Sequence, residues 1–153
     1  MRGSTGFRVG IRSVALVATG LVLAGVTVSC KLNGPTYVVT TTVDAVDANP
    51  GDGVCEVTAG AGDCSVRAAV MEANAFPGDN NIDLGTGNTY QLAPLGWEQF
   101  PDGDADGSAG DLDITDTVAF QGASTLAGTA DDRVLHVRNG ALQLDGQTVT
   151  GGT

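Results

Sequence analysis

The amino-acid sequence of 153 residues predicts a mainly β fold with one short helix. Short segments in which apolar and polar residues alternate are separated by turns rich in Gly and Asp, as in GDLDITDTVAFQG and GALQLDGQTVTGG. Val118 and Phe120 recur as Leu142 and Leu144, and this offset of 24 residues fits one coil of a β-solenoid. Because only about two coils can be recognised, a small β-sandwich is the competing architecture.

Residues 1–29 carry the features of a secretory signal peptide. Three arginines near the start precede an uncharged apolar run, SVALVATGLVLAGVTVS, which ends at the small residue Ser29. The alternative is a transmembrane anchor, but the run is slightly shorter than the about 20 apolar residues that span a bilayer. We therefore expect export, with a polar tether over residues 30–36.

Cys30 stands at the expected cleavage point. The stretch VTVSC resembles a bacterial lipobox, in which the cysteine is acylated and becomes the mature N-terminus. Thr27 departs from the Leu that this motif favours three residues before the cysteine. The resemblance implies a lipid on Cys30 that anchors the protein in a membrane of the cell envelope, and the alternative is ordinary secretion.

The cysteines predict one disulfide. Three cysteines are an odd number for an exported chain, which indicates a separate fate for one of them. If Cys30 takes the lipid, Cys55 and Cys64 remain as a pair in a compartment that permits disulfides. A Cys55–Cys64 bridge would contribute roughly 2–3 kcal/mol to stability. The alternative is two free thiols buried as small apolar groups.

The part of the chain after residue 30 is strongly acidic. It holds all 18 Asp and Glu residues against Lys31, Arg67, Arg133 and Arg138, which gives a formal net charge of −14. Nucleic-acid binding requires basic residues that displace counterions, so this composition excludes it. The composition suits a solvated exterior or bound cations.

The chain after the tether begins with a predicted strand. TYVVTTTVDA, residues 36–45, places β-branched residues with the period of a strand, and residues 47–64 are rich in turn formers. After the helix, strand signals recur in NNIDLGTGNTYQL, GDLDITDTVAFQG, RVLHVRNGALQLDG and QTVTGGT. The pattern predicts short strands separated by turns.

The helix is predicted to begin after Ser65, its N-cap, and to end at the sequence FPG. Val66 and Val70 lie on its apolar face, away from Arg67 and Glu72. A helix of about ten residues is marginal in isolation. Packing and a covalent link must therefore hold it.

These residues together resemble a known domain. CSVRAAV, with YVVTTTVDAVD and the other cysteine before it and NNIDLGTGNTYQL and GDLDIT after it, resembles the CSLREA domain. That domain lies near the N-terminus of bacterial surface and secreted proteins. It typically precedes right-handed parallel β-helix repeats like those of polymorphic outer-membrane proteins. The resemblance covers about residues 36–153.

The resemblance implies the fold class and the domain boundaries. It implies a mainly β chain, the N-terminal part of a right-handed parallel β-helix, capped by a strand and one short disulfide-tethered helix. The CSLREA-like cap would span residues 37–92, and the first coils of the β-helix would span residues 93–153. The Val66/Val70 face would cover the N-terminal end of the solenoid, whose strand edges otherwise invite association.

The sequence departs from the family at the helix start. The family's Ser-Leu-Arg-Glu forms a capping box, in which Ser at the N-cap and Glu three residues later bond reciprocally. Ala68 replaces that Glu in this chain. Ser65 can still cap the helix, and Asp63 supplies negative charge near the helix N-terminus. The cap is therefore weaker, and the disulfide matters more.

The serious alternative to a structural role is a carbohydrate-active enzyme, either a polysaccharide lyase or a glycosidase. Asp111 and Asp113 lie about 6.6 Å apart if they share one side of a strand, a separation that suits an inverting glycosidase. However, Leu112 and Ile114 are expected in the core, which would leave both carboxylates on the solvated side. The single histidine, His136, is expected at a structural or exposed strand position. We therefore expect no catalytic residues.

A calcium loop is a further hypothesis. Asp102, Asp104, Asp106, Gly107 and Asp113 occupy positions 1, 3, 5, 6 and 12 of an Asp-x-Asp-x-Asp-Gly pattern. Alternate carboxylates in a tight loop converge on one hard cation, and Gly permits the sharp turn. Against this, position 12 lacks the longer Glu, and the competing interpretation is an acidic surface loop.

We expect an exported, lipid-anchored surface protein with a structural or adhesive role and no catalytic activity. Its expected partners are a membrane, through the lipid, and a glycan or protein on the extended face of the solenoid. The alternatives are the N-terminal part of a carbohydrate-active β-helix enzyme and a small calcium-binding module. TVTGGT stops where another coil would begin, so we also expect a truncated reading frame or self-association through the open C-terminal end.

Overall fold

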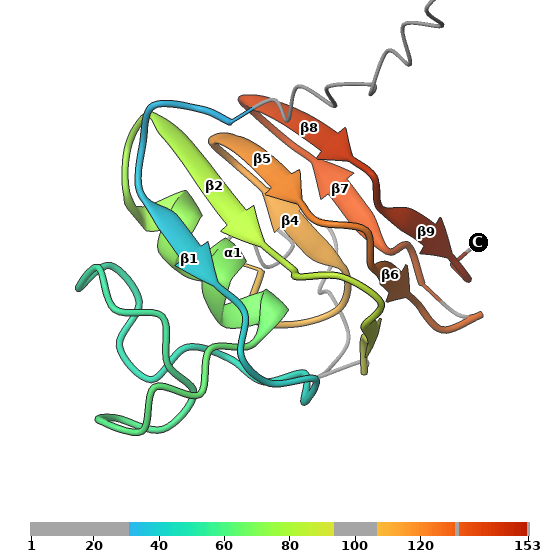
Figure 1. The fold of residues 1–153 in the computed structure, drawn as a ribbon, viewed down its shortest axis with the longest axis horizontal. Coiled ribbons are helices and arrows are strands. Elements are labelled where there is room, and N and C mark those ends of the chain that lie inside the picture. Colours follow the sequence, from blue (N-terminus) through green and yellow to red (C-terminus); the bar gives the residue numbers. More distant parts are fainter. Residues whose placement is uncertain (1–30, 94–106, 131, 153) are drawn as a thin grey trace, which may run out of the picture.

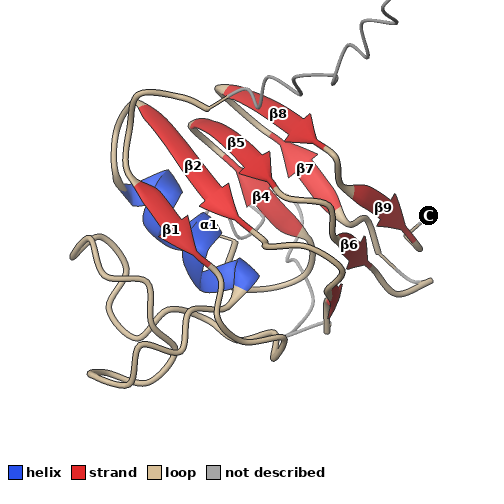
Figure 2. Ribbon diagram, in the orientation of Figure 1, coloured by secondary structure: helices blue, strands red, loops and turns tan. Residues whose placement is uncertain are grey.

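The computed structural model describes residues 31–93, 107–130 and 132–152. In these residues the chain is mainly β, with parallel sheets and one helix (Figures 1 and 2). The elements in chain order are β1 (Thr36–Val38), α1 (Val66–Ala75), β2 (Asp79–Asp83), β3 (Thr89–Gln91), β4 (Leu112–Ile114), β5 (Thr117–Gln121), β6 (Thr125–Ala127), β7 (Leu135–Val137), β8 (Ala141–Asp145) and β9 (Thr148–Thr150).

The strands form three sheets with the orders β1-β2-β5-β8, β3-β6-β9 and β4-β7. Each neighbouring pair is parallel. From β4 onward, consecutive strands visit the sheets in rotation. We call β4, β5 and β6 the inner rung, and β7, β8 and β9 the outer rung. Figure 1 shows the outer rung stacked on the inner rung, at the end of the molecule farthest from α1.

The register between the rungs confirms the pairing that the sequence spacing predicts. Val118 lies opposite Leu142 and Phe120 lies opposite Leu144, so the offset between β5 and β8 is 24 residues. The parallel pairing contradicts the β-sandwich alternative, because sandwiches are built from antiparallel sheets. Parallel strands need long connections between them. The connection from β1 to β2 contains α1, and from β2 onward each connection contains strands of the other two sheets.

Alternation along the strands places one set of side chains in a single core. The residues that alternate inward on the inner rung have no exposed surface, and the helix contributes its apolar face to the same cluster. Burial of such side chains is the main favourable contribution to folding. The fully buried apolar members from the strands and the segments beside them are Ile82, Leu84, Leu112, Ile114, Val118, Phe120 and Leu126.

Glycine is required where successive turns of the chain approach each other. Gly122 has a φ of 89°, and a Cβ at this position would collide with the backbone of Gly85. Gly140 has a φ of 72°, and a Cβ there would collide with the backbone of Asp116. Only a residue without a side chain combines this backbone conformation with such close contact.

One prediction about the N-terminal segment is corrected, and the contacts of a second segment are described. The strand predicted over residues 36–45 is limited to Thr36–Val38, because the backbone N–H groups of Thr40 and Thr41 turn away and donate to the carbonyl of Cys64. Residues 31–36, the described part of the predicted polar tether over residues 30–36, are bound to β2 through Asn81. The amide of Asn81 accepts from the N–H of Leu32 at 2.8 Å and donates to the Leu32 carbonyl at 3.1 Å.

Candidate functional site

The first candidate site is the cap unit, which we define as residues 36–76. It contains β1, a long loop and α1, and it lies at the end of the sheets that is opposite the outer rung (Figure 1). In the part of the chain that the structure describes, no helix has both the length and the apolar character needed to cross a membrane. Cys30, the predicted lipidation site, lies outside the described residues.

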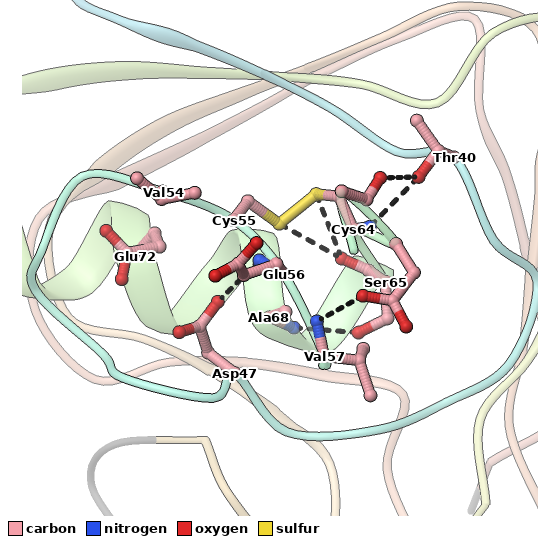
Figure 3. Close-up of a disulfide and its surroundings, with 12 residues drawn as sticks. Thr40, Asp47, Val54, Cys55, Glu56, Val57, Cys64, Ser65, Ala68 and Glu72 are labelled. Atoms are coloured by element: carbon pink, nitrogen blue, oxygen red, sulfur yellow. Dashed lines mark hydrogen bonds between the residues drawn. A yellow bond between two sulfur atoms is a disulfide. The ribbon is translucent and has the colours of Figure 1, made fainter. Parts of the chain in front are cut away.

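The predicted disulfide between Cys55 and Cys64 is confirmed (Figure 3). The two Cα atoms are 5.0 Å apart. The backbone N–H of Cys64 donates to the hydroxyl of Thr40 at 2.9 Å, and that hydroxyl donates to the carbonyl of Gly62 at 2.9 Å. The bridge therefore ties the loop to the helix start and, through Thr40, to the segment after β1.

The two predicted helix-cap residues behave differently. Ser65 is the N-cap as predicted, because its hydroxyl accepts from the N–H of Ala68 at 2.9 Å. Asp63 instead accepts from the backbone N–H groups of Val57 at 3.1 Å and Thr58 at 2.9 Å. The bond from Thr58 lowers the pKa of Asp63 below its ordinary value. Asp63 thus closes the loop that precedes the helix.

Arg67 is the most informative residue that the sequence analysis missed. Its side chain has no exposed surface and forms a bidentate pair with Asp44, with both N···O distances at 2.9 Å. The remaining guanidinium donors reach the carbonyls of Gly107 at 2.8 Å and Gly110 at 2.9 Å. Arg67 therefore links the helix to the segment that enters β4. The sequence feature that could have indicated this role is an arginine in the otherwise apolar first turns of the predicted helix.

Glu72 fixes the other side of the helix to the loop. Its carboxylate accepts from the N–H groups of Gly51 at 2.6 Å and Gly53 at 2.8 Å, and the residue is fully buried. Burial raises the pKa of Glu72 above its ordinary value, and Asp47 and Asp52 nearby raise it further, against the two backbone bonds. The disulfide and Glu72 thus hold the loop at two points along α1 (Figure 3).

Asn74 connects α1 to the edge of β4. Its side-chain amide donates to the carbonyl of Asp113 at 2.7 Å, and its oxygen accepts from the N–H of Thr115 at 2.9 Å. This pair of bonds imitates the pairing that a neighbouring strand would make. The helix therefore occupies the place beside β4 that a further strand of the β4-β7 sheet would take (Figure 2).

The second candidate site is a carboxylate cluster on β4 and β7, formed by Asp111, Asp113, Arg133, His136 and Arg138. The expectation that the two carboxylates are solvated is wrong, since each aspartate is only 1% exposed. Leu112 and Ile114 do face the core, while the carboxylates on the opposite side contact side chains of Arg133, His136 and Arg138. In the ladder, Asp113 lies directly opposite His136.

Cationic and imidazole groups from the outer rung contact both carboxylates. Arg133 Nε lies 2.7 Å from Asp111 Oδ2, and Arg138 Nη1 lies 3.3 Å from Asp113 Oδ2. His136 Nδ1 lies 2.8 Å from Asp113 Oδ1. Burial raises the pKa of Asp113, and the bond from Arg138 opposes this shift.

The carboxylate cluster contains Asp113, which is position 12 of the predicted calcium loop. Asp102, Asp104 and Asp106 lie outside the described residues, and Asp113 forms an ion pair with Arg138 and lies beside the imidazole of His136. The donor atoms of Asp111, Asp113 and His136 lie within 4.8 Å of one another, which is a spacing that can hold a metal ion. However, two guanidinium groups already balance the two carboxylates, so a cation would gain little net attraction.

The chain matches no protein family model, no curated protein and no solved structure.

Proposed function

We propose that the chain is the N-terminal part of a right-handed parallel β-helix at a bacterial cell surface, with a structural or adhesive role and no catalytic activity. The observation that carries the proposal is the cap unit, which covers one end of a stack of parallel sheets. Arg67 and Asn74 bind backbone groups in and before β4, so the edge of that sheet is satisfied by side chains of the helix.

The repetition of the two rungs supports the β-helix. The inner and outer rungs visit the same three sheets in the same order, with ladder offsets of 23 or 24 residues. The inward residues of each rung pack on those of the neighbouring rung, as the repeats of a solenoid do. Such a stack gives an extended face on which a glycan or another protein can bind.

The disulfide supports export. Structural disulfides persist in oxidising compartments outside the cytosol and are rare within it. Cys55 and Cys64 are bridged, which leaves Cys30 as the remaining cysteine of the chain, next to the apolar leader. We propose that a lipid on Cys30 holds the cap unit at a membrane.

The burial of the carboxylate cluster supports a role without catalysis. A glycosidase needs two carboxyl groups that reach the sugar on either side of its scissile bond. Asp111 and Asp113 are each 1% exposed and engaged by arginine side chains. They therefore serve as internal ion-pair partners that join β4 to β7, and a glycan chain has no access to them.

The test compares adhesion with glycan depolymerisation. Cells that express the full chain should bind immobilised glycans or matrix proteins better than cells that lack it, and the purified chain should release no new sugar ends from acidic or neutral polysaccharides. Asp113→Asn, checked for native folding by circular dichroism, is the matched variant. Depolymerisation by the wild type that disappears in folded Asp113→Asn would overturn the non-catalytic proposal.

A further inference from the structure

The tether contains an asparagine followed by a glycine, Asn33-Gly34. Asn33 is exposed, and within the described ranges its side-chain amide has no hydrogen-bond partner. Asparagine side chains elsewhere in the fold are used in hydrogen bonds, and the residues concerned are Asn49, Asn74, Asn80, Asn81 and Asn88. The amide of Asn33 is therefore open to reaction in a way that theirs are not.

The backbone requires glycine after Asn33. A Cβ at Gly34 would collide with the carbonyl oxygen of Asp79, so a residue with a side chain does not fit here. In the part of the chain that the structure describes, the N–H of Gly34 donates no hydrogen bond either. The backbone nitrogen that follows Asn33 is therefore unhindered by a side chain and is not engaged by an acceptor.

These features favour cyclisation of Asn33. The backbone nitrogen of Gly34 loses its proton to hydroxide and attacks the side-chain Cγ of Asn33, which forms an N–Cγ bond. The Cγ–Nδ2 bond breaks, and Nδ2 takes up a proton and leaves as ammonia. Water then opens the resulting five-membered succinimide ring. Cleavage of the bond to Cγ gives aspartate, and cleavage of the bond to the main-chain carbonyl carbon gives isoaspartate.

We propose that Asn33 is a self-modification site, at which deamidation to isoaspartate releases Leu32 from Asn81. The Asn81 amide holds the chain on both sides of Asn33. It accepts from the N–H of Leu32 at 2.8 Å, and it donates to the carbonyls of Leu32 at 3.1 Å and Gly34 at 3.3 Å. Isoaspartate adds one methylene group to the main chain between these two points, so one amide no longer reaches both.

The Leu32 side gives way because the other side is held more firmly. The carbonyl of Pro35 accepts from the backbone N–H of Asn81 at 2.8 Å, and β1 begins at the next residue. Among the described residues, Leu32 is held by hydrogen bonds to the Asn81 side chain alone. Aspartate at position 33 keeps the length of the main chain and leaves these bonds in place. The modification is independent of export and of the lipid.

Peptide mapping of aged protein tests the modification. The full chain carries Asn139→Ser, so that Asn33-Gly34 is the single Asn-Gly pair of the sequence. In folded protein held at mildly alkaline pH, the peptide that contains residue 33 should lose the Asn33 amide and become a substrate for isoaspartate methyltransferase. Asn88 should stay intact in the same digest, because its side chain donates to the carbonyl of Leu84 at 3.0 Å.

Asn33→Gln is the matched control. Its amide has the same chemistry, but the extra methylene disfavours the five-membered ring, so the peptide that contains residue 33 should not be labelled. At mildly acidic pH the wild type should react more slowly, because the attacking nitrogen must lose its proton. Asn33 that stays intact in the folded protein while it reacts in the urea-unfolded chain would overturn the proposal.

Hydrogen exchange tests the release of Leu32. The Leu32 N–H should be protected in fresh wild type and in fresh Asn33→Asp, which has the charge of the product without the extra methylene. Aged wild type should lose this protection in proportion to its isoaspartate content. A Leu32 N–H that stays protected in the aged protein, or that is equally unprotected in fresh Asn33→Asp, would contradict release by lengthening of the main chain.

Discussion

Arg67 places a positive charge inside the protein, and Asp44 is its partner there. The Arg67 side chain has no exposed surface and that of Asp44 is 3% exposed, and the guanidinium also binds backbone carbonyls before β4. Removing one partner leaves the other charge buried and uncompensated, which costs about 3–5 kcal/mol. We therefore predict that Arg67→Met lowers the free energy of unfolding by that amount in urea titrations, and that adding Asp44→Leu recovers part of the loss. Equal stability of wild type and Arg67→Met would contradict this role.

Glu72 gives a prediction about pH. Burial raises its pKa in the folded protein, so its contribution to stability is complete below the unfolded pKa and is lost as the pH rises through the folded pKa. Glu72→Gln removes this dependence, although it also weakens a bond to a glycine N–H. The stability difference between wild type and Glu72→Gln should be largest near about pH 4 and should narrow toward neutral pH.

The measurement for Glu72 is the urea midpoint across that range. Glu56→Gln is the control for loss of one negative charge in the same loop. A difference between wild type and Glu72→Gln that widens as the pH rises would show that the ionised carboxylate is the stabilising form.

The role of a residue could be predicted from the sequence when its bonding partner lies close to it in the chain. Ser65 caps an N–H three residues away, and the Cys55–Cys64 bridge follows from the number of cysteines. Arg67 and Asn74 were missed because their partners lie 23 to 44 residues away in the chain. A periodicity argument assigns such polar residues to solvent, although distant backbone groups can satisfy them inside the protein.

At the scale of elements, α1 depends on its connections. It has ten residues, which is marginal for an isolated helix, and the capping box lacks its acidic member. The disulfide holds its first turn, Glu72 fixes its middle to the loop, and Asn74 fixes its last turn to β4. The helix is therefore a consequence of its packing more than of its own propensity.

Removing the disulfide should destabilise this element. We predict that Cys55→Ser/Cys64→Ser lowers the free energy of unfolding by about 2–3 kcal/mol, because the bridge restricts a short loop in the unfolded chain. Thermal unfolding followed by circular dichroism measures the effect. Reductant should lower the melting temperature of the wild type and leave the double variant unchanged, and the opposite pattern would refute the prediction.

The strands show what alternation predicts and what it misses. The spacing of Val118 and Phe120 from Leu142 and Leu144 gave the correct ladder partners, because stacked rungs repeat the same inward positions. The same alternation wrongly assigned Asp111 and Asp113 to solvent. Both faces of a parallel sheet can be covered, and here β7 and the residues beside it supply polar partners for both carboxylates.

At the scale of the whole molecule, the lipid anchor can be tested by mass. Intact-mass measurement of membrane-extracted protein should show cleavage before Cys30 and an acyl adduct that is lost in Cys30→Ser. The membrane fraction should lose the protein at the same time. A soluble, unmodified wild-type product cut at another position would refute lipid anchoring and leave secretion as the route.

The docking of Leu32 onto Asn81 has a mechanical consequence. Only Lys31 separates Leu32 from Cys30, and an extended chain gains about 3.3–3.6 Å per residue. A lipid on Cys30 would therefore hold β2 within about one nanometre of the bilayer surface, with no slack for the protein to swing away. Force applied to a ligand on the sheets would reach the membrane through the bonds of the Asn81 amide to Leu32 and through the backbone pairing of β1 with β2. Asn81→Ala would remove the side-chain bonds to Leu32, so that a longer segment separates the lipid from the folded sheets and the orientation of the protein on the cell is less fixed.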